Sequence, residues 1–160
     1  MSACWAICGI SEPKRKAIEW LTSQVTPGST CFVYGNLPVL YDLLDCKNPT
    51  RVDTTAPGAL TAADAEEAIA ALRRHPPDYL VAHDKTAMVP ALPAALDGRL
   101  ESYGGFNPEP IRELHVGLRA LLDQYEPVGM VGDILGATLS EKLDALPDHA
   151  SAIRLYRHKR

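Results

Sequence analysis

The clearest pattern along the chain is a short apolar run that a glycine joins to an amphipathic stretch. Residues 30–34 (TCFVY) are mostly β-branched or aromatic, which is typical of a strand covered on both faces. Gly35 relieves the turn, Asn36 can cap a helix, and Pro38 stands in the first helical turn, where its missing N–H loses no hydrogen bond. Apolar residues then recur at helical spacing, at Leu37, Leu40, Tyr41 and Leu44. The pattern predicts a strand, a turn and a helix, which is the basic unit of an α/β domain.

Other stretches repeat this alternation of helix and strand. Apolar positions at helical spacing predict helices at 11–25, 61–74 and 110–122. Apolar or alternating runs predict further strands at 50–54, 78–83, 126–132 and 151–157. Thr61 and Asp64 form a T-x-x-D capping signature at the start of the second helix. The periodicity is lost over 84–109, where we expect a long surface loop.

These elements predict a single α/β domain over residues 11–160. Short links between the early strands favour parallel pairing, and the alternation of Ile153 and Leu155 with polar neighbours favours an antiparallel last strand. We therefore expect a three-layer, Rossmann-like sandwich of about five strands, mostly parallel, with an antiparallel last strand. Residues 1–10 form a short apolar run ahead of this domain. We interpret this run either as a core strand or as the last turns of a membrane helix.

Charge and cysteine spacing exclude several classes of protein. The formal net charge of −4 argues against nucleic-acid binding, because proteins that bind nucleic acids usually carry a basic field. We interpret the basic runs 14–16 and 157–160 as solvated ends. The four cysteines match neither a CxxC pair nor a zinc ribbon. Cys31 is expected to be a small buried hydrophobe, with a disulfide or ligand role as the alternative.

The sequence contains none of the familiar catalytic signatures that we sought. Residues 34–38 offer one glycine and no lysine, so they match neither a dinucleotide-binding loop nor a P-loop. GxSxG, HExxH and sugar-nucleotide DxD motifs are also missing from the chain. We therefore predict no catalytic residue, no metal site and no cofactor.

The best candidate for a binding site lies where two predicted strands end. His83 and Asp84 close the strand at 78–83, and open α/β sheets usually bind ligands at the carboxyl ends of their strands. The predicted binding residues are Tyr34, Gly35, Asn36, Thr54, His83 and Asp84. The alternative is that these strand ends simply meet solvent. His115 stands on the apolar face of its helix and is expected to be a core histidine.

Six groups of short motifs follow one another in an order that resembles a known family. They are 6–10 with 17–21 and 26–28, then 31–35 (CFVYG), 38–41 (PVLY), 49–51 (PTR), 76–81 (PPDYLV), and 122–128 with 153–157 (IRLYR). This order resembles the carboxyl-terminal, extramembranous domain of GT-C type membrane glycosyltransferases. Those enzymes include relatives of dolichyl-phosphate-mannose protein mannosyltransferases and bacterial lipid-linked sugar transferases.

The resemblance implies a domain that is not itself catalytic, since the family's acidic catalytic residues lie on loops between early transmembrane helices. It implies a role in binding a lipid-linked sugar donor or the acceptor, with the transmembrane portion of the enzyme as partner. It also implies a periplasmic or extracellular location, although the basic run 14–16 favours the cytoplasmic side. One alternative is a small stand-alone enzyme using Asn36, His83 and Asp84. Another is a stand-alone, cytoplasmic ligand-binding or protein-interaction module whose loop at 98–108 docks a partner.

Overall fold

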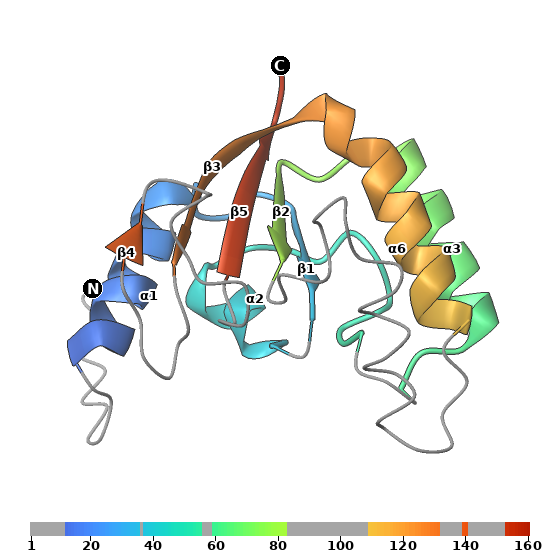
Figure 1. Cartoon of the computed structure of the whole chain (residues 1–160), viewed down its shortest axis with the longest axis horizontal. Coiled ribbons are helices and arrows are strands. Elements are labelled where there is room, and N and C mark those ends of the chain that lie inside the picture. Colours follow the sequence, from blue (N-terminus) through green and yellow to red (C-terminus); the bar gives the residue numbers. More distant parts are fainter. Residues whose placement is uncertain (1–11, 36, 56–58, 83–108, 132–138, 141–152) are drawn as a thin grey trace.

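Helices cover both faces of a mixed β-sheet (Figure 1). The structure, a computed structural model, describes residues 12–35, 37–55, 59–82, 109–131, 139–140 and 153–160. Its helices are α1 (Glu12–Gln24), α2 (Val39–Leu43), α3 (Ala62–Arg74) and α6 (Glu109–Leu121), which runs into the 3-10 turn η1 (Leu122–Gln124). Its strands are β1 (Cys31–Tyr34), β2 (Tyr79–Ala82), β3 (Tyr125–Val131), β4 (Leu139–Ser140) and β5 (Ile153–His158). The general α/β class expected from the sequence is confirmed.

The strands lie in the order β1-β2-β5-β3-β4, and β4 contributes only two residues. β1 and β2 run parallel, with Cys31 opposite Tyr79 and Tyr34 opposite Ala82. The neighbouring pairs β2 with β5, β5 with β3 and β3 with β4 are antiparallel. The expectation of a mostly parallel sheet is therefore wrong. The expected antiparallel pairing of the strands predicted at 126–132 and 151–157, now β3 and β5, is confirmed.

The strand predicted at 50–54 does not form, and one of the expected strand pairings is lost with it. The side chain of Asn48 accepts a hydrogen bond from the backbone N–H of Thr50 at 2.9 Å and donates one to the carbonyl of Val52 at 2.8 Å. Local side-chain bonds of this kind compete with the regular ladder of a sheet. Val52 is still buried, so the segment packs on the core without joining the sheet.

One face of the sheet packs against α1 and α2. Alternate residues of the strands point to this face and form a buried cluster with the two helices and the residues just after them: Ala17, Leu21, Val25, Cys31, Val33, Leu40, Leu44, Cys46, Tyr79, Val81, Val131, Ile153 and Leu155. Gly129 in β3 lets α1 approach closely, because a Cβ atom there would lie 2.8 Å from Cζ2 of Trp20. The apolar stripe predicted for the helix after Gly35 lies in this core, as expected.

The other face packs against α3 and α6, and its buried cluster includes Phe32, Tyr34, Ala65, Leu72, Leu80, Leu114, Leu118 and Tyr125. The two helices touch where α6 has a glycine, since a Cβ atom on Gly117 would lie 2.6 Å from Cγ1 of Ile69. The predicted capping signature is confirmed, because Thr61 and Asp64 form a capping box at the start of α3. The side chains that recur at helical spacing in α3 and α6 are buried or partly buried in this core: Ala65, Ala68, Ile69, Leu72, Ile111, Leu114, His115, Leu118 and Leu121.

A disulfide joins Cys31 to Cys46, which corrects the expectation that Cys31 is an unpaired hydrophobe. The two Cα atoms are 5.8 Å apart, inside the usual range for a disulfide. The pairing arises because the chain turns back after α2, so that the backbone N–H of Cys31 donates to the carbonyl of Lys47 at 3.0 Å. Cysteine spacing alone does not reveal this return. Cys4, Cys8 and residues 84–108 of the loop predicted at 84–109 lie outside the described residues, and Glu109 begins α6.

Candidate functional site

The parallel pair β1–β2 has two ends, and each is a place where side chains of different segments meet. At its carboxyl end Tyr34 lies opposite Ala82, so the chain leaves both strands at the same edge. At its amino end Cys31 lies opposite Tyr79, and β5, which runs the other way, finishes here at His158. The sequence predicts the binding site at the carboxyl end.

Gly35 and Thr55 bond to each other at the carboxyl end. The backbone N–H of Gly35 donates to the hydroxyl of Thr55 at 2.7 Å, and the N–H of Thr55 donates to the carbonyl of Gly35 at 3.3 Å. Gly35 has a φ of 132°, which favours glycine over residues with a side chain. Thr55 is buried and the neighbouring Thr54 is half-buried. Two predicted site residues, Gly35 and Thr54, therefore belong to segments that are joined here.

The side chain of Tyr34 does not line the predicted binding site. Its side chain is 5% exposed and lies in the core between the sheet and α6. The centre of its ring is 6.3 Å from that of His115, which is buried in the same region, as the sequence predicted for this histidine. Tyr34 therefore supports the carboxyl end from inside the core and does not line it with its ring. Asn36, His83 and Asp84 lie outside the described residues.

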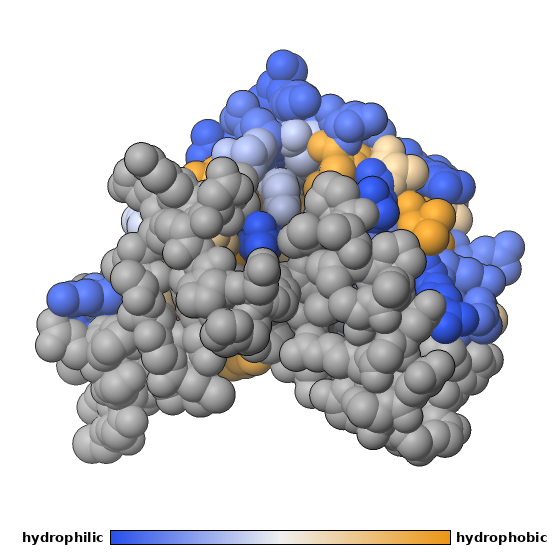
Figure 2. All heavy atoms as spheres, in the orientation of Figure 1, coloured by the Kyte–Doolittle hydropathy of each residue, from blue (hydrophilic) through white to orange (hydrophobic). Residues whose placement is uncertain are grey.

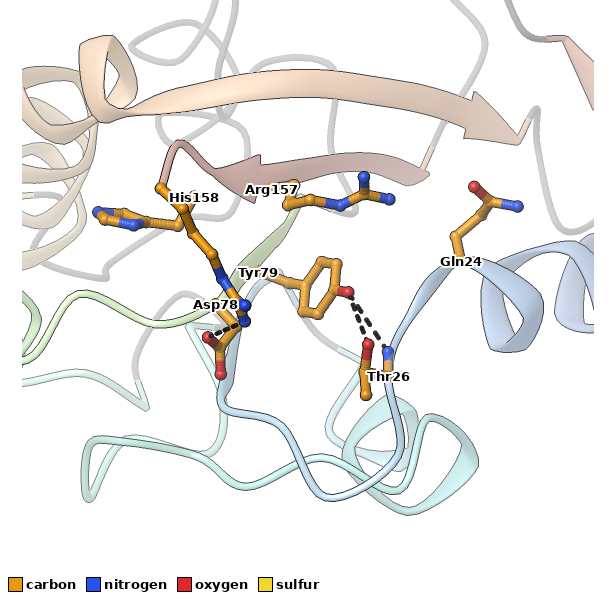
Figure 3. A pocket seen from close by; sticks show the side chains of 7 residues that line it. Gln24, Thr26, Asp78, Tyr79, Arg157 and His158 are labelled. Carbon is orange, nitrogen blue, oxygen red and sulfur yellow. Dashed lines mark hydrogen bonds and ion pairs between the residues drawn. The ribbon is translucent and has the colours of Figure 1, made fainter.

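A pocket of about 400 Å³ lies at the opposite, amino end of the parallel pair (Figure 3). Residues from the end of α1, the start of β2 and the end of β5 line it: Gln24, Thr26, Asp78, Tyr79, Arg157, His158 and Arg160. Hydrophilic side chains gather at this end of the molecule, where the chain leaves β5 (Figure 2). The volume falls within the range of roughly 300–1,000 Å³ that is usual for small-molecule sites.

Asp78 holds β1 and β2 together beside this pocket. Its Oδ2 accepts hydrogen bonds from the backbone N–H of Thr30 at 3.0 Å and from the Thr30 hydroxyl at 2.9 Å. The N–H of Thr30 is the main reason that the pKa of the Asp78 carboxyl lies below its usual value, while partial burial opposes the shift. Oδ1 lies 4.0 Å from Nη2 of Arg160, whose side chain is 92% exposed. Asp78 is therefore ionised at neutral pH, and its hydrogen bonds from Thr30 are stronger than its contact with Arg160.

Tyr79 forms the buried floor of the pocket, and Arg157 lies over it. The Tyr79 hydroxyl is 3.2 Å from the hydroxyl of Thr26 and accepts from the Thr26 backbone N–H at 3.4 Å. Tyr79 and Arg157 are register partners in β2 and β5, so their side chains share one face of the sheet. The guanidinium carbon of Arg157 is 6.0 Å from the centre of the ring, within the distance of a cation–π contact.

Sequence reasoning missed this pocket. It treated residues 157–160 as a solvated end, whereas Arg157 and His158 are paired residues of β5. The sequence signal was present in the alternation of Ile153 and Leu155, which places Arg157 on the same side of the strand. The pairing of β5 with β2 has no local signature, so the sequence could not put Arg157 beside Tyr79.

The described residues were compared with the usual requirements of a membrane-spanning helix and of a metal-ligand cluster. Among the described helices none is both long enough and apolar enough to cross a bilayer. Within the same part of the chain, no three histidine, cysteine or acidic side chains are grouped so as to hold a metal ion. Comparisons with protein-family models, with curated proteins and with solved structures find no match to this chain.

Proposed function

We propose that this chain is the non-catalytic, extramembranous domain of a GT-C type membrane glycosyltransferase, and that the carboxyl end of β1–β2 helps to bind the lipid-linked sugar donor or the acceptor. Within this proposal the fold is a Rossmann-like variant in which β1, α3 and β2 form the one parallel unit. The proposal starts from the ordered motifs of the sequence. The direction in which α1 runs along the sheet is the structural observation that supports it most directly.

Helix α1 begins at the same end of the molecule as the proposed binding edge. Its last turn leads to Thr26, which bonds to Tyr79 at the amino end of the parallel pair. From there the 13 residues of α1 run back along the sheet for about 20 Å, so Glu12 lies toward the carboxyl end of β1 and β2 (Figure 1). A membrane segment that leads into α1 would therefore approach the domain from the side of the proposed binding site, the carboxyl end of β1–β2.

One motif segment, 31–35, meets the connection that follows another, 49–51, at this end of the strands. Gly35 of the first bonds to Thr55, which lies four residues beyond the second. Backbone groups near the carboxyl ends of parallel strands are the usual ligand-binding groups of open α/β sheets. This supports a shared role for the two segments at a site that faces the membrane portion of the enzyme.

The disulfide supports the proposed exterior location. Disulfides persist in the periplasm and outside cells, and reducing conditions make them rare in the cytosol. Cys31 and Cys46 are both buried, and they join β1 to the segment after α2. The stand-alone cytoplasmic alternative would place this bond in a compartment where disulfides are rare.

Cell fractionation tests the membrane part of the proposal. An antibody raised against the purified domain is expected to detect, in cells that express the native gene, a polypeptide much longer than 160 residues. This polypeptide should stay in the membrane fraction after washing with high salt and alkaline carbonate, which release peripheral proteins. A soluble polypeptide of about the size of this chain, with no membrane-bound form, would contradict the proposal and favour the stand-alone module.

A further inference from the structure

The amino-end pocket is the strongest feature that the proposed function leaves unexplained. It lies at the opposite end of β1–β2 from the proposed donor or acceptor site. We propose that it binds the phosphate monoester group of a small soluble molecule, with Arg157 as the main contact and Arg160 and Gln24 beside it. The inference does not depend on the glycosyltransferase assignment.

The charges that line the pocket favour an anion. Arg157 and Arg160 supply two positively charged side chains, and Asp78 supplies the one carboxylate side chain among the lining residues. The Asp78 carboxylate is engaged by two hydrogen bonds from Thr30 through one oxygen. Its other oxygen has only the 4.0 Å contact with Arg160. Because exposed ion pairs contribute little, Arg160 can turn from Asp78 to a bound anion at small cost.

The position of Arg157 is fixed by the sheet beneath it. Its backbone is paired on both sides, with Tyr79 in β2 and with Glu126 in β3. Its guanidinium lies over the Tyr79 ring, and that ring is held in turn by the bonds of its hydroxyl to Thr26. A guanidinium that is already oriented loses less side-chain entropy when it binds a phosphate, and its fork of N–H groups suits two phosphate oxygens.

The opposite wall supplies neutral polar groups. Gln24, at the end of α1, faces Arg157 across the pocket, and the hydroxyls of Thr26 and Tyr79 lie below them (Figure 3). A carboxamide and hydroxyls suit the bridging oxygen or the hydroxyl groups of the molecule that carries the phosphate. A dianionic phosphate also matches two arginines better than a carboxylate with its single charge does. The chemical class that we infer is therefore a small hydroxylated phosphate monoester.

NMR titration of the protein with inorganic phosphate at constant ionic strength tests this inference. We expect saturable shifts at the amides of Thr26, Tyr79 and Arg157, with a Kd of about 1 mM, as expected for a few charge-assisted contacts. Glycerol 3-phosphate should bind at the same amides at least as tightly. The Arg157→Gln variant should bind phosphate about tenfold more weakly, because a hydrogen-bonded charge pair is lost.

The matched control is Arg73→Gln, which removes the same charge from an exposed position on α3, away from the pocket. It should leave the phosphate affinity unchanged. Arg157→Gln should shift the unfolding midpoint only slightly, because the side chain is exposed and a cation–π contact at an exposed site contributes little to stability. An equal loss in both variants would show a general effect of charge and overturn the proposal. Acetate binding as tightly as phosphate, or no saturable shift at these amides, would overturn it as well.

Discussion

The two ends of the parallel pair β1–β2 are joined in different ways. At the amino end, side chains connect segments that are far apart in the sequence: Asp78 bonds to Thr30, and Tyr79 bonds to Thr26. The Cys31–Cys46 disulfide lies here as well. At the carboxyl end, the described side-chain link is between Gly35 and Thr55, which share three hydrogen bonds of 2.7 to 3.3 Å.

This difference suggests that the amino end mainly stabilises the fold and that the carboxyl end mainly serves ligand binding. The long-range bonds at the amino end fix how α1, β1 and β2 lie relative to one another, so their loss should lower the stability of the whole domain. The bonds at the carboxyl end shape one turn at the place where α/β sheets usually bind ligands. Changes there should therefore affect binding more than folding. Each of the following substitutions tests one side of this comparison.

Removal of the disulfide should have the largest effect. The double variant Cys31→Ala/Cys46→Ala opens a cross-link between residues 15 positions apart, which corresponds to about 3 kcal/mol of unfolding free energy in the chain-entropy account. Urea unfolding of the oxidised wild type and the variant measures the difference. Reduced wild type serves as the control and should lose a similar amount. If oxidised and reduced wild type unfold at the same urea concentration, the amino end is not stabilised in this way.

Asp78→Ala should have the next largest effect. It removes the two hydrogen bonds that Thr30 donates to the carboxylate. Because the side chain is 43% exposed, we expect a loss of only about 1–2 kcal/mol in unfolding free energy. Denaturant unfolding at neutral pH measures it. Glu126→Ala, which replaces another exposed carboxylate on the sheet, is the control and should change stability by less than about 0.5 kcal/mol.

The contribution of Asp78 should also depend on pH. Since its folded-state pKa is lowered, its stabilising effect is complete above the unfolded-state pKa of about 4 and is lost as the pH falls through the folded-state value. The difference in unfolding free energy between wild type and Asp78→Asn should therefore be largest near neutral pH and shrink below about pH 4. A difference that grows on acidification would contradict a stabilising hydrogen bond from Thr30 to the ionised Asp78 carboxylate.

Thr55→Val, at the carboxyl end, should have the smallest effect on stability. It keeps the shape of the side chain but removes a hydroxyl that accepts from the Gly35 N–H at 2.7 Å and donates to the Gly35 carbonyl at 3.3 Å. The carbonyl keeps its bond from the Thr55 N–H, so we expect a loss of about 1 kcal/mol in unfolding free energy. Thr55→Ser, which keeps the hydroxyl, is the matched control for ligand binding. If Thr55→Val destabilises the domain more than Asp78→Ala does, the comparison between the two ends fails.

The sequence predicted the elements better than their arrangement. The β-branched and aromatic runs identified β1 and β2, and the Thr61–Asp64 signature identified the start of α3, because these signals act within a few residues. Strand pairing is decided by segments that are distant in the chain. The sequence therefore did not show that β5 lies between β2 and β3, and the expectation of a mostly parallel sheet was wrong.

The candidate site was predictable only in part, for a related reason. Reasoning about strand ends correctly placed Tyr34 and the end of β2 at one edge of the sheet. It could not tell which face the ring of Tyr34 would take, because β1 is apolar on both faces and its alternation has no polar side. It also could not foresee that the Asn48 side chain would bond to the backbone of Thr50 and Val52, so that residues 50–54 form no strand and Thr55 bonds to Gly35.

The most direct test of the proposed function is an NMR titration with a water-soluble, short-chain polyprenyl-phosphate sugar. Saturating inorganic phosphate should be present, so that the amino-end pocket does not contribute. We predict saturable shifts at the amides of Gly35, Thr54 and Thr55 and of the predicted site residues Asn36, His83 and Asp84, weakened in Thr55→Val and retained in Thr55→Ser. Shifts confined to other parts of the domain, or no saturable shift, would contradict a ligand-binding role for the carboxyl end.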